Sequence, residues 1–202
     1  MTTIAVAVKD GMACIASDSL TSFGDMRLPP GMAEDKRKIL KVGPSYIGLS
    51  GSAAHFGVLE SYFAGEGRSP DFTSRRSVFE TWRKLHEVLK SEYFLNPKDE
   101  ASDPYESSQL TALVASPWGL YGVFSLREVF VYRKFWAMGS GREFALGALQ
   151  ALYDPLETAR EIAEQAVLAA CEFDKNSAPP VQSHVVALES ASAPAPRRRS
   201  RG

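Results

Sequence analysis

The sequence predicts an α+β fold in which two antiparallel sheets are each covered by a pair of helices. Periodic segments follow one another as strands, two helices, strands, two helices and a final strand. The strands are short and separated by turn residues, which is typical of antiparallel pairing. The 202 residues are 45% hydrophobic, which is enough for the core of one domain. This order of elements fits a four-layer αββα sandwich and a two-layer α+β fold equally well.

The first strands form a hairpin near the N-terminus. Residues 4–8 alternate between apolar and other positions, an Asp-Gly pair predicts a tight turn, and residues 12–16 return as the second strand. Residues 21–35 predict a long loop because they are rich in glycine and proline. Two further strands are predicted over residues 36–42 and 45–50.

Two amphipathic helices follow these strands. The first has one apolar stripe, made of Ala54, Val58 and Tyr62. The second repeats apolar residues at spacings of four, three and four, at Val78, Trp82, Leu85 and Leu89. Residues 95–108 are polar and predict an exposed connection.

The second half of the chain predicts a three-stranded meander and two more helices. The meander covers residues 110–115, 120–126 and 129–133. The third helix has its apolar positions at Phe144, Gly147, Ala148 and Ala151. The apolar face of the fourth helix consists of Ala159, Ile162, Ala166, Ala169 and Phe173. Residues 181–188 predict the last strand.

Charge and composition bound the domain and its partners. We expect one domain over residues 1–190, with Met1 removed, and a disordered basic tail over residues 191–202, where Ala, Ser and Pro precede an arginine cluster. The net charge of −1 predicts neither a nucleic acid nor a membrane surface as partner. The chain has no signal peptide and no apolar run of about 18 residues, so we expect a cytoplasmic protein.

The sequence does not predict a metal ion or an organic cofactor. His55, His86 and His184 are scattered, and none has a cysteine or carboxylate at ligand spacing. The Gly139-Ser140-Gly141 segment lacks the Lys-Ser/Thr of a phosphate-binding loop and the third glycine of a dinucleotide fingerprint.

Thr2 is the first candidate for chemistry. It becomes residue one when Met1 is removed, and its small side chain permits that removal. A threonine hydroxyl is a poor nucleophile unless a base takes its proton, and a free α-amine on the same residue can do so. The unperturbed pKa of an α-amine is about 7.7–8.0, so much of it is already neutral near pH 7.

The motifs that follow Thr2 carry a specific resemblance to a known family. Thr2-Thr3-Ile4 is followed by Ala16-Ser17-Asp18-Ser19, by a lysine ahead of Ile39-Leu40-Lys41-Val42, and by Gly48-Leu49-Ser50-Gly51-Ser52 before a helix. In this order the motifs resemble proteasome β-subunits and the HslV peptidase, which are N-terminal nucleophile (Ntn) hydrolases. They are most similar to a smaller branch, the beta-proteobacterial proteasome homologue. The resemblance covers nearly all of residues 2–188 and implies the four-layer αββα sandwich.

The resemblance also implies the roles of four catalytic residues. Thr2 is the nucleophile, and Asp18 orients a lysine whose charge eases loss of the hydroxyl proton. That lysine is assigned to Lys38, with Lys36 as the competing assignment. Gly51 supplies the backbone N–H that stabilises the oxyanion, and the start of the following helix suits that role.

A second group of polar residues completes the implied site. Ser140 resembles the serine that hydrogen-bonds the threonine amine. Asp174 and Ser177 resemble the family's second Asp-x-x-Ser pair, although this chain has Ala178 where relatives usually have glycine. An alternative interpretation is that Asp174 and Asn176 only cap a helix and turn the chain.

Five further residues are expected to contact substrate. Thr21 and Ser22 lie on an edge that pairs with an extended peptide. The pocket for the residue before the cleaved bond is expected to be lined by Leu49, Ser52 and Ala53, with an apolar preference.

These expectations together predict a threonine endopeptidase that needs no cofactor. The family implies a homo-oligomer of stacked rings with six or seven subunits each, which acts on unfolded proteins or peptides, and an ATP-dependent unfoldase is a candidate partner. A catalytically silent ring or scaffold subunit that keeps Met1 is the second hypothesis, and a small-molecule Ntn amidase is the third. Thr2, Asp18, the lysine and Ser140 together argue against a silent subunit, since such a subunit is free to lose them.

Overall fold

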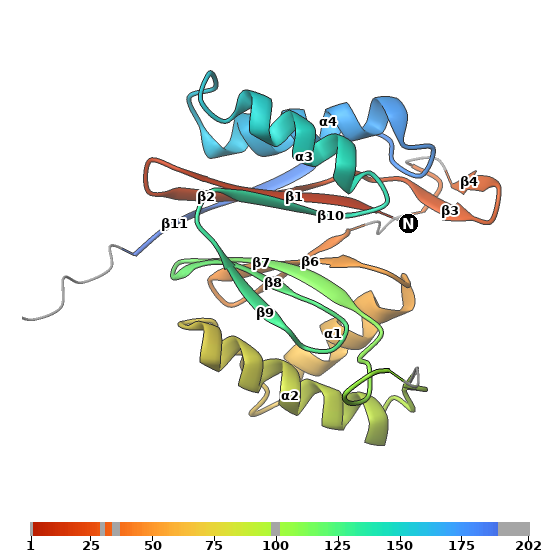
Figure 1. The fold of residues 1–202 in the computed structure, drawn as a ribbon. Coiled ribbons are helices and arrows are strands. Elements are labelled where there is room, and N and C mark those ends of the chain that lie inside the picture. The colour runs from red at the N-terminus through yellow and green to blue at the C-terminus, as the bar shows by residue number, and fades with distance from the viewer. Residues whose placement is uncertain (1, 29–30, 34–36, 98–101, 190–202) are drawn as a thin grey trace, which may run out of the picture.

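The computed structural model describes residues 2–28, 31–33, 37–97 and 102–189, and it shows four layers (Figure 1). Two antiparallel sheets lie face to face in the middle, and a pair of helices covers the outer face of each sheet. The four-layer αββα sandwich is therefore confirmed, and the two-layer alternative is excluded. The predicted tail, residues 191–202, lies outside the described residues.

The first sheet has the order β10-β1-β2-β11. Its strands are β1 (Thr3–Lys9), β2 (Met12–Ser17), β10 (Phe135–Gly139) and β11 (Gln182–Ala187). The predicted hairpin is present, with Ile4 opposite Ser17 and Lys9 opposite Met12. The helices α3 (Arg142–Leu152) and α4 (Ala159–Phe173) cover its outer face.

The second sheet has the order β5-β6-β7-β8-β9. Its strands are β5 (Ile39–Val42), β6 (Ser45–Ser50), β7 (Thr111–Ser116), β8 (Gly119–Val123) and β9 (Val129–Tyr132). The helices α1 (Ala54–Ala64) and α2 (Arg75–Ser91) cover it. The predicted stripe of α2 is fully buried against this sheet, at Val78, Trp82, Leu85 and Leu89.

The side chains of β1 alternate between two apolar cores because successive residues of a strand point to opposite faces. Ile4 and Val6 join the core between the two sheets, where they meet residues of β7 such as Leu113. Ala5 and Ala7 join the core under α3 and α4. This alternation sets the directions of the two residues that precede Ile4.

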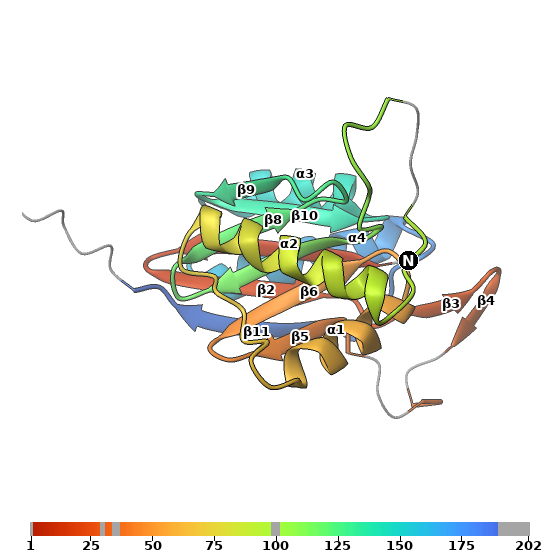
Figure 2. The same ribbon diagram turned by 90° about the horizontal axis from the view of Figure 1, so that it is seen from below.

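Three strands were not predicted. Phe135–Gly139 forms β10, which pairs with β1 along its whole length. Part of the predicted loop over residues 21–35 is a hairpin made of β3 (Thr21–Phe23) and β4 (Met26–Leu28). This hairpin projects from the end of the sandwich at which the N-terminus lies (Figures 1 and 2).

The predicted apolar face of the third helix is wrong except for Ala148, which packs against the core. Ala145 and Leu149 face the sheet, whereas Phe144 is 43% exposed. Phe173 of the fourth helix is 72% exposed as well, and its ring lies 5.4 Å from that of Phe144. Alanines make up most of the inner side of the two helices, with Leu149, Ile162 and Val167 among them, whereas the rings of Phe144 and Phe173 remain outside.

Candidate active site

Thr2 lies at the end of β1 and is only 7% exposed. By the alternation along β1, Thr2 is on the face of Ile4, between the sheets, and Thr3 is on the face of Ala5, under the helices. Thr2 lines a cavity of about 480 Å³ at this end of the sandwich. Met1 lies outside the described residues.

Asp18 and Lys38 form a buried ion pair beside this cavity. The distance between Lys38 Nζ and Asp18 Oδ1 is 2.8 Å, and their side chains are 11% and 0% exposed. The Asp18 carboxylate also accepts the backbone N–H groups of Thr3, Leu20 and Ala178, at 2.9, 3.0 and 3.3 Å. Four donors therefore fix one carboxylate in position.

Burial lowers the pKa of Lys38, and the Asp18 carboxylate opposes that shift. A lysine with a lowered pKa that lies in a cleft beside a carboxylate is a functional-site candidate. Of the other lysines in this run, Lys41 is exposed and Lys36 lies outside the described residues. The geometry thus brings Lys38 to Asp18, as the first assignment expected.

The Gly139-Ser140-Gly141 segment passes against the first residues of β1. The N–H of Ser140 donates to the Thr2 carbonyl oxygen at 2.8 Å. A Cβ at position 139 would lie 1.7 Å from that same oxygen, and a Cβ at position 141 would lie 2.3 Å from Thr3 Oγ1. Both glycines are required because no side chain fits between the two chain segments.

Asp174 ends α4 and gathers the hydroxyl groups of two serines. Its Oδ2 accepts Ser140 Oγ–H at 2.6 Å and Ser177 Oγ–H at 2.7 Å, while Oδ1 accepts the Asn176 N–H at 3.1 Å. Burial alone raises the pKa of Asp174, but these hydrogen bonds outweigh it and lower that pKa below its usual range. Asp174 is also the C-cap residue of α4, so the helix cap of the alternative interpretation is present beside these hydrogen bonds.

The lowered pKa of Asp174 predicts that its contribution to the stability of the fold depends on pH. Since the folded-state pKa is below the ordinary 3.8, the ionised carboxylate stabilises the fold above that pH and loses this effect as the pH falls through the folded value. We expect Asp174→Asn to be less stable than the parent near neutral pH. Urea unfolding at about pH 6 and about pH 3 tests this: the stability gap between parent and variant should narrow at the lower pH. A gap of constant size would contradict the role of the carboxylate charge.

Gly51 lies at the end of β6, two residues before Ala53, the N-cap of α1. Gly51 was expected just at the helix start. Because α1 begins only at Ala54, the Gly51 N–H is not one of the first amides of the helix. Its φ of +125° lies in the region that favours glycine. Gly51 therefore fixes its peptide group in an orientation that other residues rarely adopt.

We expect Gly51→Ala to lower peptide hydrolysis while costing about 1–3 kcal/mol of stability, because alanine strains this backbone. The control is Gly11→Ala, which also places alanine at a positive φ, +74°, in the β1–β2 turn with open space around it. Kinetics and urea unfolding of both variants separate the two effects. Equal activity in the two variants would contradict a role for Gly51 in the reaction.

The cavity at Thr2 also contains all five residues expected to contact substrate. Thr21 and Ser22 come from β3, Leu49 from β6, and Ser52 and Ala53 from the segment before α1. Leu20, Leu28, Ala33, Arg37, Phe56 and Gly57 line it too and were not predicted. Their signal in the sequence is weak because four of them lie in the predicted 21–35 loop or beside it, where periodicity is absent.

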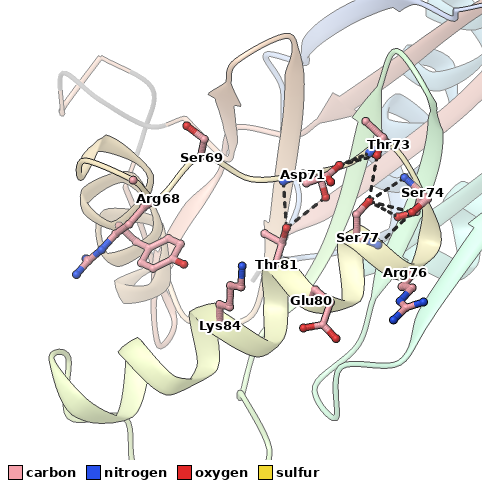
Figure 3. Close-up of a pocket in the computed structure, with 12 residues that line it drawn as sticks. Arg68, Ser69, Asp71, Thr73, Ser74, Arg76, Ser77, Glu80, Thr81 and Lys84 are labelled. Carbon is pink, nitrogen blue, oxygen red and sulfur yellow. Dashed lines mark hydrogen bonds between the residues drawn. The ribbon is translucent and has the colours of Figure 1, made fainter.

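A second cavity lies in the α1–α2 layer, between the end of α1 and the start of α2 (Figure 3). Asp71, Thr73, Ser74 and Ser77 hydrogen-bond to one another at this helix start, and Thr81 bonds to the backbone of Asp71. These contacts include the capping box of α2, in which Ser74 and Ser77 bond to each other's backbone N–H groups. No predicted site residue lines this cavity.

Among the described residues, no group of three or more His, Cys, Asp or Glu side chains could hold a metal ion. Within the same ranges, no helix has the length and hydropathy needed to cross a membrane.

Comparison with known proteins decides the family. A sequence model described as "Proteasome subunit" matches residues 1–186. The chain belongs to the proteasome subunit family. A "Proteasome subunit beta" of Nanoarchaeum equitans is 29% identical over 188 residues, which cover 86% of each chain. The chain is thus a proteasome-like β-subunit.

Solved structures agree with this family assignment. Thiobacillus denitrificans BPH is 38% identical, with a TM-score of 0.87 over 93% of this chain and 98% of that one. The same protein in complex with epoxomicin is 37% identical, with a TM-score of 0.85 over 93% and 100% of the two chains. HslV from Trypanosoma brucei is 20% identical with a TM-score of 0.67 over 92% and 99%, and it shows the shared fold alone.

Proposed function

We propose that this proteasome-family chain is a threonine-type endopeptidase subunit whose nucleophile is Thr2 after removal of Met1. The observation that carries the proposal is the position of Thr2 in one cavity with Lys38, whose ammonium pairs with buried Asp18. Thiobacillus denitrificans BPH, which is 37% identical in its complex with epoxomicin, supports a protease function for this chain.

The proposed reaction is acyl transfer to the Thr2 hydroxyl. The free α-amine of Thr2 takes the hydroxyl proton, and the Lys38 charge favours its loss. The hydroxyl oxygen attacks the peptide carbonyl, the Gly51 N–H stabilises the oxyanion, and the α-ammonium protonates the leaving amine. Water then hydrolyses the Thr2 ester with the α-amine again as base.

The second polar group would hold the α-amine in place. Ser140 Oγ donates its single proton to Asp174, so its lone pairs remain available to accept a hydrogen bond from that amine. Ser177 fixes the same Asp174 oxygen from the other side. The carboxylate would therefore determine where Ser140 points.

Substrate binding is assigned to the cavity walls. Thr21 and Ser22 belong to the β3 edge, along which an extended peptide would add as a further strand. Leu49, Ala53 and Phe56 give the adjoining wall an apolar character, which supports an apolar residue before the cleaved bond. Ser52 lies on the same wall.

We further propose that the subunits form a cytoplasmic homo-oligomer of stacked rings with six or seven members each. Rings of this kind would enclose the Thr2 sites and admit only unfolded proteins or peptides. An ATP-dependent unfoldase is the proposed partner for folded substrates. The support for these proposals is the family.

Hydrolysis of an unfolded polypeptide tests the proposed function. We expect the assembled parent chain to cut it into peptides, Thr2→Ser to retain part of the rate because it keeps a hydroxyl beside an α-amine, and Thr2→Ala to fall to background. Cleavage of small amides but not of the polypeptide would favour an amidase. Equal rates for Thr2→Ala and the parent would exclude Thr2 as nucleophile.

A further inference from the structure

Thr3 is fully buried, and neither the sequence motifs nor the proposed reaction gives it a role. Its side chain points under the helices, away from the cavity that contains Thr2. There Thr3 Oγ1 lies 2.7 Å from Ser177 Oγ and accepts the Gly141 N–H at 3.1 Å. A threonine hydroxyl that joins two parts of the site across 174 residues of sequence calls for a physical account.

The ionised state of Asp174 fixes the direction of each hydrogen bond in the series that links Gly141, Thr3, Ser177 and Asp174. Asp174 has a lowered pKa, so near neutral pH it is ionised and can only accept. Ser177 therefore gives its proton to Asp174 and must accept from Thr3 Oγ1–H. Thr3 in turn accepts from the Gly141 N–H. Each group thus donates to the next, from the Gly141 N–H to Thr3, from Thr3 to Ser177 and from Ser177 to Asp174.

These hydrogen bonds form a ring, because Asp174 also accepts a hydrogen bond from Ser140, the residue before Gly141. Ser140 donates its hydroxyl to the same Asp174 oxygen and its N–H to the Thr2 carbonyl oxygen. The Thr3 hydroxyl is thus one link of a ring that fixes Ser140 against Thr2. Hydrogen bonds in such a ring polarise one another, so the loss of one link weakens the rest.

The backbone of Thr3 holds the other half of the site. Its N–H donates to Asp18 Oδ1 at 2.9 Å, and its carbonyl oxygen accepts the Asp18 N–H at 3.2 Å. The same Oδ1 pairs with Lys38. Thr3 is therefore in direct contact with both polar groups that flank Thr2, and it follows Thr2 in the chain.

We propose that Thr3 is a positioning residue: its hydroxyl fixes the Ser140–Asp174–Ser177 group, its backbone fixes Asp18 beside Lys38, and together these contacts hold the Thr2 hydroxyl and amine in reacting geometry. This inference rests on the proposed function of Thr2. It assigns to Thr3 an effect on the rate of reaction and not on substrate binding, because its side chain does not line the cavity.

The test compares Thr3→Val with Thr3→Ser in the assembled protein. Valine keeps the shape and β-branching of threonine but leaves the buried Gly141 N–H without its acceptor, whereas serine restores the hydroxyl. We expect kcat of Thr3→Val to fall by about 10- to 100-fold with KM changed by less than about threefold. Thr3→Ser should stay within about threefold of the parent kcat.

Thr81→Val is the matched control. Thr81 is also buried, and its Oγ1 likewise makes two hydrogen bonds, with the N–H and the carbonyl oxygen of Asp71 in the cavity of Figure 3. We expect Thr81→Val to lose thermal stability much as Thr3→Val does and to keep the parent kcat. An equal loss of kcat in both variants would overturn the inference, because the effect would then be general.

Labelling by an epoxyketone separates failure of this inference from failure of the proposed function. A parent chain that neither hydrolyses peptide nor takes the label at Thr2 overturns the proposed function and, with it, the role of Thr3. A parent that does both, while Thr3→Val reacts at the parent rate, overturns the role of Thr3 alone. The expected result is a labelling rate of Thr3→Val reduced in the same ratio as kcat.

Discussion

Lys38→Met is expected to lower kcat for peptide hydrolysis by about 1,000-fold while the chain still folds. Methionine keeps much of the length of lysine but removes the charge that favours loss of the Thr2 proton. The fold should survive because Asp18 retains three backbone donors, from Thr3, Leu20 and Ala178. Steady-state kinetics and circular dichroism of the purified assembly measure the two effects.

Asp18→Asn tests the other member of the same ion pair. It removes the negative charge beside Lys38, whose side chain is only 11% exposed. Breaking a buried pair from one side costs about 3–5 kcal/mol, so we expect a large fall in the urea midpoint together with loss of activity. If Lys38→Met kept the parent kcat, the ion pair would be structural and the proposed role of Lys38 would be wrong.

Gly139→Ala is expected to destabilise the fold by about 4 kcal/mol or more, which is at the extreme of single substitutions. Its Cβ would lie 1.7 Å from the Thr2 carbonyl oxygen and 2.7 Å from the carbonyl carbon. Both are backbone atoms of the strand end that carries the nucleophile, so the overlap can be relieved only by separating β10 from β1. The φ of +101° adds strain.

Gly147→Ala is the control for this substitution. Gly147 lies within α3, and a Cβ there would meet nothing within 4 Å. Alanine should stabilise the helix by up to about 1 kcal/mol. Urea unfolding of both variants gives the comparison. A Gly139→Ala variant as stable as the parent would contradict the close approach of residue 139 to Thr2.

Much of this fold could be predicted from the sequence because its cores follow simple periods. The β1–β2 hairpin follows from alternation around an Asp-Gly turn, and α2 follows from the spacing of Val78, Trp82, Leu85 and Leu89. Strand β10 was missed because Phe135–Gly139 is apolar without alternation, and only its pairing with β1 makes it a strand. Phe144 was placed inward because hydrophobicity alone does not tell which side of an apolar helix a sheet will cover.

In the site, too, the motifs could be predicted from local sequence, whereas the contacts between distant segments could not. Its motifs lie in the sequence in an order that resembles the family, and the structure brings their residues to one end of the sandwich. The pairing of Lys38 with Asp18 is a distance between residues 20 positions apart, which no local pattern contains. The contact of Thr3 with Ser177 joins the two ends of the chain, so it too could be found only in three dimensions.

The most direct test of the central claim is the intact mass of the purified protein before and after treatment with an epoxyketone. We predict a chain without Met1 that gains one adduct, and no adduct on Thr2→Ala. This measurement does not depend on substrate choice or on an unfoldase. A chain that retains Met1 and takes no label would contradict Thr2 as the nucleophile and would favour a catalytically silent subunit.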